Sequence, residues 1–208
     1  MVSRVFPSHH PKKGQSTHFV EKILDSVQYG WFLNYYEWLV KNNPNIPSDD
    51  ISSFVKTIQA IETQPKHHTV RAGKHLKVGD TVSLRVWSDK PYRSKQIIIA
   101  PDQEIKKLWD IEIKKVPLRS NKSKGMYVVF IDGKAQTNEK EFMKLVANDG
   151  LSFEDFCDWF ELNNEKKEIH FEGQIICWND SIDYEIQPAA KAPEDGEEKT
   201  EAVKTLLN

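Results

Sequence analysis

The spacing of apolar residues changes near Thr69, and this change limits the possible folds more than any other feature of the chain. Between residues 20 and 62, apolar side chains recur at steps of three and four, which is the period of an amphipathic helix. After Thr69 they alternate with polar side chains, as in the stretch 82–87, which is the period of a half-buried strand. The sequence therefore predicts an α+β fold whose N-terminal part is helical and whose remainder consists mainly of strands.

Turn signals divide the second part of the chain into short strands and two helices. The polar loop 88–94 predicts a hairpin with a basic tip, and the pair Asp132 and Gly133 is a strong signal for a tight turn. Helices are expected at 138–147 and 152–161, and Ser152 with Asp155 forms a capping box for the second. The expected strands are 82–87, 95–100, 104–115, 126–131, 134–137 and 169–178. Strands that close on themselves would form a small mixed β-barrel flanked by short helices.

The chain is long enough for one domain and a tail. Its 208 residues slightly exceed the roughly 100–200 residues of a common domain. Residues 188–208 are rich in Ala, Pro, Glu and Lys with little apolar content, which predicts a disordered acidic tail. Aromatic residues of the helical part, among them Trp31, Tyr35 and Trp38, have the spacing of a buried helix face and are expected in the core.

Positive and negative charges are segregated along the chain, although the formal net charge is only −2. Residues 1–65 carry 6 Lys/Arg and 6 Asp/Glu, residues 66–134 carry 16 and 7, and residues 135–208 carry 7 and 18, giving 0, +9 and −11. A basic segment with aromatic residues such as Trp87 and Tyr92 suits a nucleic acid, because phosphates need cations and bases need flat faces. Lysine-rich strand edges also serve solubility, and charge alone leaves both interpretations open.

The cellular context is predicted from apolar runs and cysteines. No run approaches the roughly 20 apolar residues of a membrane-spanning helix, so no integral membrane segment is expected. Residues 1–13 lack the apolar core of a secretory signal, which predicts a cytoplasmic location. Cys157 and Cys177 lie in an expected helix and strand, where a reducing compartment would keep them as small buried side chains. No cofactor is expected.

The segment from Lys66 to Arg71 concentrates side chains that can perform chemistry. Thr69 and Arg71 share one face of an expected strand, whereas Lys66 can approach Thr69 only if the chain turns, as the preceding Pro65 favours. A threonine hydroxyl needs a base, and a lysine can be that base where burial lowers its pKa. A carboxylic acid would still be needed to protonate a leaving amine. The simpler interpretation makes Thr69 a strand former and the two cations solvated surface residues.

A longer pattern surrounds this segment. It consists of Lys66-x-x-Thr69-x-Arg71, then His75-x-Lys77-x-Gly79-Asp80-x-Val82, the strand at Arg85 and the hairpin at Tyr92, and later of Asp149-Gly150-Leu151-Ser152, Phe156 and the strand from Phe171 to Trp178. This pattern resembles the ASCH domain, a PUA-like β-barrel family linked to RNA, over about residues 66–178. The resemblance implies that residues 2–24 form the family's first strand and helix, that about 28–62 are a helical insertion, and that 1–187 are one domain.

The resemblance also implies an activity. Small bacterial members of the family are amidohydrolases that remove acetyl groups from acetylated cytidine with a lysine, a threonine and a glutamate. Their counterparts in this chain would be Lys66, Thr69 and Asp149, the last being a shorter carboxylate. Lys66 would then accept the proton of Thr69, Thr69 would attack the amide carbonyl, and Asp149 would protonate the departing amine.

Three functions compete at this point. The first is an RNA- or nucleotide-binding protein with a basic cleft around Thr69 and Arg71. Its further ligand contacts would be His68, Lys77, Arg85, Tyr92, Arg93 and Lys95. The second is an amidohydrolase that acts on an acylated nucleoside such as acetylcytidine through Lys66, Thr69 and Asp149, which should then meet in one cleft. The third is a protein-interaction module, which would require the aromatic side chains of the helical part to be exposed.

The histidines His67, His68 and His75 raise the question of a zinc site. Neighbouring histidines on a strand point to opposite faces, and no second group of ligands has suitable spacing. We therefore expect no metal at this position, and we expect these side chains to form a pocket wall or to contact phosphate.

Overall fold

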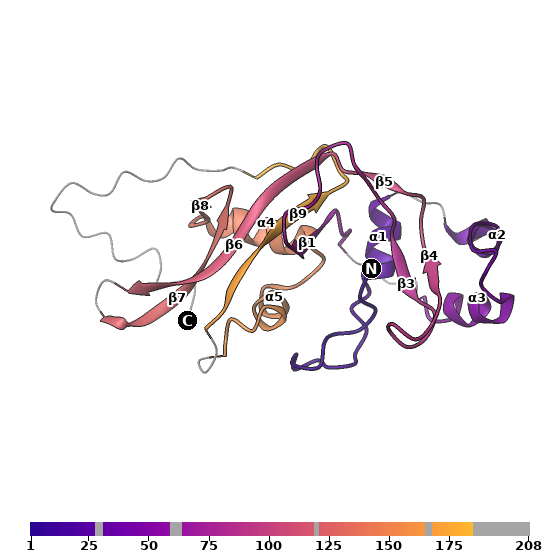
Figure 1. Ribbon diagram of the computed structural model, residues 1–208, viewed down its shortest axis with the longest axis horizontal. Helices are drawn as coiled ribbons and strands as arrows, with labels where there is room; N and C mark the ends of the chain where they lie inside the picture. The colour runs from indigo at the N-terminus through magenta and orange to yellow at the C-terminus, as the bar shows by residue number, and fades with distance from the viewer. Residues whose placement is uncertain (28–30, 59–63, 119–120, 165–167, 185–208) are drawn as a thin grey trace.

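The computed structural model describes residues 1–27, 31–58, 64–118, 121–164 and 168–184. Its helices are α1 (Phe19–Ser26), α2 (Trp31–Asn42), α3 (Ser48–Val55), α4 (Glu139–Asn148) and α5 (Phe153–Trp159). Its strands are β1 (His68–Ala72), β2 (Thr81–Val82), β3 (Arg85–Trp87), β4 (Gln96–Ile98), β5 (Gln103–Glu104), β6 (Lys107–Leu118), β7 (Asn121–Ile131), β8 (Lys134–Ala135) and β9 (His170–Cys177). Figure 1 shows α2 and α3 at one end of the molecule beside β4, and α4 and α5 beside the main sheet.

The main sheet is antiparallel and has five strands in the order β1-β9-β6-β7-β8. Two further pairs, β2 with β5 and β3 with β4, form separate two-stranded ribbons. The predicted α+β class is therefore confirmed. Within the described residues, β1 and β8 stay at opposite edges of the main sheet, so the expected closed barrel is not found. The edge strand β8 has only two residues, which leaves it too short to carry further pairing.

Local sequence signals placed several elements correctly. The hairpin around residues 88–94 is present as β3 and β4, whose register pairs Arg85 with Ile98. Asp132 and Gly133 form the tight turn between β7 and β8 with positive φ angles of 47° and 75°. The helix predicted at 152–161 is α5, and its capping residue accepts the backbone N–H three positions later at 3.1 Å.

Other predictions need correction, or concern residues outside those that the structure describes. The expected strand 104–115 is divided into β5 and β6, because the intervening Ile105 is fully buried and its N–H donates to the carbonyl of Asp80 at 2.8 Å. The predicted helical stretch 20–62 consists of α1, α2 and α3, while residues 28–30 and 59–63 lie outside the described residues. The predicted tail at 188–208 also lies outside them.

One apolar core joins the sheet, the ribbons and the helices. Along β6, Ile111 and Ile113 are buried while Glu112 between them faces the other side of the sheet. Tyr35 of α2 is buried, as expected, and its hydroxyl donates to the carbonyl of Ile99 at 2.7 Å. Trp38 is half-buried, and the side chain of Trp31 lies outside the description. The buried Tyr35 disfavours an interaction surface built from these aromatics.

Cys157 and Cys177 are both free and buried, in α5 and β9. Burial raises the pKa of each thiol to about 11, so both are protonated at neutral pH. They therefore behave as the small buried side chains that the sequence predicts. No helix in the described ranges is long and apolar enough to cross a membrane.

Candidate functional site

A cavity of about 480 Å³ opens between β1, α1 and the end of α5. Its lining includes Lys66, Thr69 and Arg71 from the motif around β1, and Asp149 from the end of α4. Lys66 and Asp149 are 83 positions apart in the sequence. The fold therefore brings together the three residues that the sequence assigned to catalysis, with Arg71 beside them.

The segment that precedes β1 is held between the middle of α1 and the end of α4. The N–H of Lys66 donates to the carbonyl of Lys22 in α1 at 2.9 Å, and the N–H of His67 donates to the carbonyl of Asn148 in α4 at 2.9 Å. On the other side, the N–H of Trp178 donates to the carbonyl of His67 at 3.2 Å. These backbone bonds fix where the Lys66 side chain starts, and they satisfy a carbonyl at the end of α4 that has no partner within the helix.

Lys66 and Asp149 form a buried ion pair. Lys66 Nζ lies 2.7 Å from Asp149 Oδ1, it also donates to the backbone carbonyl of Asp149, and it stands 4.3 Å from the centre of the Phe19 ring. The two residues are only 3% and 6% exposed. Burial lowers the pKa of Lys66, although Asp149 opposes this shift. Burial would raise the pKa of Asp149, but the charge of Lys66 and the contact with His68 outweigh it and lower that pKa.

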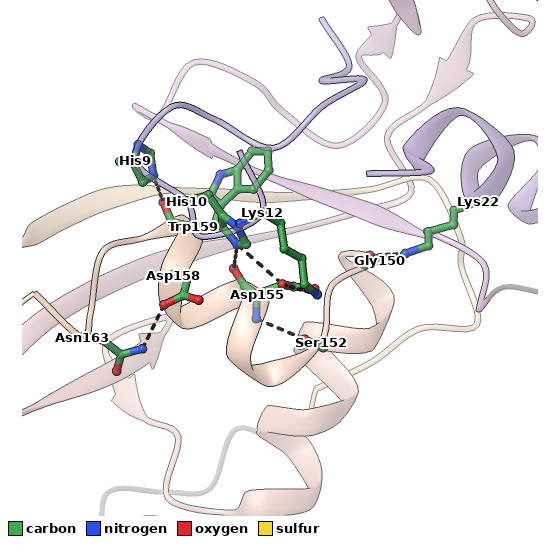
Figure 2. Close-up of polar contacts among 10 residues, drawn as sticks. All are labelled: His9, His10, Lys12, Lys22, Gly150, Ser152, Asp155, Asp158, Trp159 and Asn163. Carbon is green, nitrogen blue, oxygen red and sulfur yellow. Dashed lines mark hydrogen bonds and ion pairs between the residues drawn. The ribbon is translucent and has the colours of Figure 1, made fainter. Parts of the chain in front are cut away.

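The turn after α4 presents Asp149 to the cavity. Gly150 has a φ of +75°, which favours glycine. A Cβ atom there would also lie 3.3 Å from Cβ of Lys66, which is a second reason for glycine at this position. Figure 2 shows Lys22 reaching from α1 to the carbonyl of Gly150, at 2.6 Å. It also shows Lys12 against Asp155 at the start of α5, where the closest N–O distance is 2.8 Å. Lys22 thus holds the short connection between α4 and α5, and Lys12 holds the first turn of α5.

Thr69 and Arg71 occupy one face of β1, as the sequence predicts. In the register with β9, Thr69 pairs with Ile176 and Arg71 with Gln174. The strand approaches β9 closely, because a Cβ atom at Gly173 would lie only 2.0 Å from the carbonyl oxygen of Arg71. The Arg71 side chain is exposed, and its guanidinium donates to the carbonyl of Met1. It can therefore turn toward an anion at the cavity mouth.

His68 is not part of the lining of the first cavity; it directly precedes Thr69 on β1, and successive residues of a strand point to opposite faces. Its side chain is fully buried, with Nδ1 3.6 Å from Asp149 Oδ1 and the ring 5.9 Å from that of Tyr184. Burial lowers its pKa, which keeps the imidazole neutral at neutral pH. His68 therefore supports Asp149 from behind.

A second cavity of about 560 Å³ adjoins the first and shares Arg71 with it. Its lining includes Trp87 and Tyr92 of the β3–β4 hairpin, whose rings are 5.4 Å apart. Tyr92 is 90% exposed and has a positive φ of 62° at the hairpin tip. The two cavities therefore lead from the Lys66–Asp149 pair to an aromatic pair in which Trp87 is half-buried and Tyr92 is exposed.

The other expected ligand contacts are not part of either cavity lining that the structure describes. Lys77 and Arg93 are exposed, and Lys95 donates to the carbonyl of Asn45 at 2.6 Å. Arg85 is half-buried, and its Nε donates to the hydroxyl of Ser83 at 3.0 Å. These four cations surround the hairpin and the loop after β1 and do not line the cavities.

Sequence reasoning missed two contributors to the site. Phe19 is a buried apolar residue of α1, and nothing in the sequence around it indicates that its ring lies against the Lys66 ammonium. Lys22 is a polar residue on the same helix, and only the folded chain shows its contact with Gly150. Both contacts join segments far apart in the sequence, so local patterns carry no signal for them.

The assembled site combines a buried cation–carboxylate pair, a hydroxyl, an exposed guanidinium and an aromatic pair. These groups can bind a polar ring and an attached anion. The lysine, the carboxylate and the hydroxyl also resemble the parts of an acyl-transfer site. No family model matches this chain, and comparisons with curated proteins and with solved structures find no match.

Proposed function

We propose that this protein binds RNA or a modified nucleoside in the cavity beside Thr69 and Arg71. The observation that carries the proposal is the shared cavity, in which the motif at 66–71 meets Asp149. Its volume of about 480 Å³ lies within the roughly 300–1,000 Å³ of small-molecule sites. One nucleoside fits such a volume.

The inner end of the cavity offers hydrogen-bonding groups to a base. The carboxylate of Asp149 accepts, the ammonium of Lys66 donates, and the hydroxyl of Thr69 does both. The exposed edge of an unpaired nucleobase carries donors and acceptors in alternation, and proteins read single-stranded RNA through that edge. Apolar wall residues such as Phe19 complete a surface against which a base can pack.

The second cavity extends the proposed site along a strand of RNA. Arg71 belongs to both cavities, and in this proposal it would contact a phosphate between two nucleotides. Trp87 and the highly exposed Tyr92 offer ring faces on which a second base can stack. Arg93 and Lys95, on the same hairpin, would contact further phosphates.

The binding proposal predicts a loss of affinity when the guanidinium or the exposed ring is removed. In fluorescence anisotropy with labelled oligouridine, Tyr92→Ala should weaken binding by the roughly 1–3 kcal/mol that stacking contributes per base. Arg71→Ala should weaken binding too, and should reduce the slope of log affinity against log salt by about 0.7, the value for one phosphate on a single strand. Lys140→Ala, an exposed lysine of α4, is the matched control and should leave affinity within two-fold, about 0.4 kcal/mol.

Two results would contradict this proposal. One is the absence of binding at low salt, where phosphate contacts are strongest. The other is equal affinity in the original protein, Arg71→Ala and Tyr92→Ala, which would place the RNA elsewhere on the surface.

We propose as a second candidate an amidohydrolase acting on an acylated nucleoside. This is the activity implied by the resemblance to the ASCH domain, which is a PUA-like family. The observation that favours it is the buried Lys66, whose pKa is lowered by burial, in the same cavity as Thr69. Burial favours the neutral amine, and Lys66 in that form, not as the cation of the ion pair, can take the hydroxyl proton as Thr69 attacks the amide carbonyl. The lowered pKa of Asp149 disfavours the acid role that the resemblance implied for it, so in this proposal Lys66 would return that proton to the departing amine. Water would then hydrolyse the threonine ester.

The second candidate predicts hydrolysis that depends on the hydroxyl at position 69. N4-acetylcytidine and related acylated nucleosides should be hydrolysed by the original protein and by Thr69→Ser, which keeps a hydroxyl. Thr69→Val keeps the shape of the side chain without the nucleophile and should reduce the rate at least about 100-fold. Chromatography of the deacylated product measures this. Activity that survives in Thr69→Val would exclude the assigned nucleophile, while RNA binding without hydrolysis would leave the first proposal alone.

A further inference from the structure

A separate group of metal-ligating side chains lies on the main sheet, outside the lining of both cavities. Glu112 of β6 stands directly opposite Glu172 of β9 in the strand register. His170 precedes Glu172 by two positions on β9 and therefore points to the same face of the sheet. All three side chains are at least partly exposed, so a dissolved ion can reach them.

The three side chains converge on one point. His170 Nε2 lies 2.9 Å from Glu112 Oε1 and 3.3 Å from Glu172 Oε1. One ligand atom from each residue can be chosen so that all lie within 4.8 Å of one another. Atoms around a single zinc ion, each about 2.0–2.2 Å from the metal, are spaced within this limit.

We propose that Glu112, His170 and Glu172 bind a divalent transition-metal ion of the Zn²⁺ type. One imidazole nitrogen and two carboxylate oxygens form a ligand set that such ions accept, whereas Mg²⁺ and Ca²⁺ prefer oxygen ligands alone. Two carboxylates directly opposite each other on neighbouring strands repel, and a cation between them removes this repulsion. Three protein ligands leave at least one position on the ion for water or another molecule.

Lys114 competes with the proposed ion for Glu112. Its Nζ lies 2.9 Å from Glu112 Oε2, the carboxylate oxygen that does not contact His170. The same ammonium lies 4.6 Å from the centre of the Phe130 ring. A positive charge this close to the carboxylate repels a second cation, so removing it should strengthen metal binding.

The inference is tested by titrating the full-length chain with ZnCl₂ in an isothermal calorimeter, and with CoCl₂ while recording visible absorption. One ion should bind per chain, and Co²⁺ should develop the absorption bands of a protein-bound ion. Because even the outer partners of metal ligands are worth about 10- to 100-fold in affinity, His170→Ala and Glu172→Gln should each weaken binding at least about ten-fold. Lys114→Met should strengthen it, and MgCl₂ should not compete at equal concentration.

The control is His9→Ala, which removes an exposed histidine outside the cluster and should leave the affinity for Zn²⁺ unchanged. Binding that is as tight in His170→Ala as in the original protein would overturn the inference. So would a loss in His9→Ala as large as that in His170→Ala, since it would show binding scattered over surface histidines. None of these results depends on RNA binding or hydrolysis at the cavity.

Discussion

Lys66→Met is expected to lower the free energy of unfolding by about 3–5 kcal/mol, because it leaves the buried carboxylate of Asp149 without its cation. The pair is nearly inaccessible to water, with Lys66 3% and Asp149 6% exposed. Its N–O distance is 2.7 Å. The other side-chain contact that the described residues make with this carboxylate is the neutral His68 at 3.6 Å, so no cation in direct contact remains. Urea unfolding followed by circular dichroism measures the loss.

A second substitution distinguishes the destabilising effect of the unpaired Asp149 charge from the effect of losing the Lys66 side chain. In the double variant Lys66→Met/Asp149→Leu both charges are gone, and we expect most of the stability to return, since an apolar pair of similar volume can replace a buried ion pair. Lys12→Met breaks the more exposed pair with Asp155 and should cost only about 0–1 kcal/mol. A double variant as unstable as Lys66→Met would show that the lysine stabilises the fold by packing, and the ion-pair account would fail.

Between about pH 7 and pH 4, the folding stability of Lys66→Met should change with pH in the opposite direction to that of the original protein. In the original protein the pKa of Asp149 is lowered, so its contribution is present above the unfolded pKa and disappears as pH falls through the folded pKa. Without Lys66, burial dominates and raises that pKa, so the folded variant gains a proton and becomes more stable as pH falls. The stability difference between the two proteins should therefore narrow between about pH 7 and pH 4.

Phe156→Ala is expected to cost about 3–5 kcal/mol, because a fully buried aromatic side chain is replaced by a cavity. The Phe156 ring lies 5.6 Å from that of Phe142 in α4 and 4.7 Å from that of Phe160 at the end of α5. Phe160 in turn contacts Phe171 of β9, at 4.9 Å, and lines the first cavity. The substitution should thus reduce stability and also weaken ligand binding.

The matched control is Phe153→Ala, one turn earlier on the same helix. Phe153 is only half-buried and contacts Phe142 at 5.7 Å, so its removal should cost clearly less than that of Phe156. Thermal unfolding and oligouridine binding of both variants can be compared directly. An equal loss in the two variants would mean that α5 is stabilised by its apolar surface in general, without a special role for the ring that joins it to the sheet.

Features governed by neighbours in the sequence could be predicted well. The capping residue Ser152 and the turn at Asp132 and Gly133 act within a few residues, and the structure shows both. Period-two alternation likewise identified β6 and β9. The residues Thr69 and Arg71 were assigned to one strand face by the same geometry, and both line the cavity.

Features governed by distant partners were predicted only in part. Strand alternation could not show that β1 and β8 would remain separate edges, since closure depends on tertiary pairing. The division between β5 and β6 depends on Ile105 reaching the core, which no local pattern reveals. His170 and Glu172 are close in the sequence, but the register that places Glu112 beside them exists only in the folded sheet.

The position of Arg71 in both cavities has a consequence for how they respond to ligands. A ligand that draws the guanidinium into one cavity changes the charge that the other presents. Thermodynamic linkage then requires each ligand to alter the affinity of the other by the same factor. Titrating a mononucleotide at several fixed concentrations of a second would measure that factor, and Arg71→Ala should reduce it to one. The two cavities share five lining residues, Met1, Val2, Ser3, Phe19 and Arg71, and Arg71 is the one among them whose side chain carries a charge that can couple the two sites.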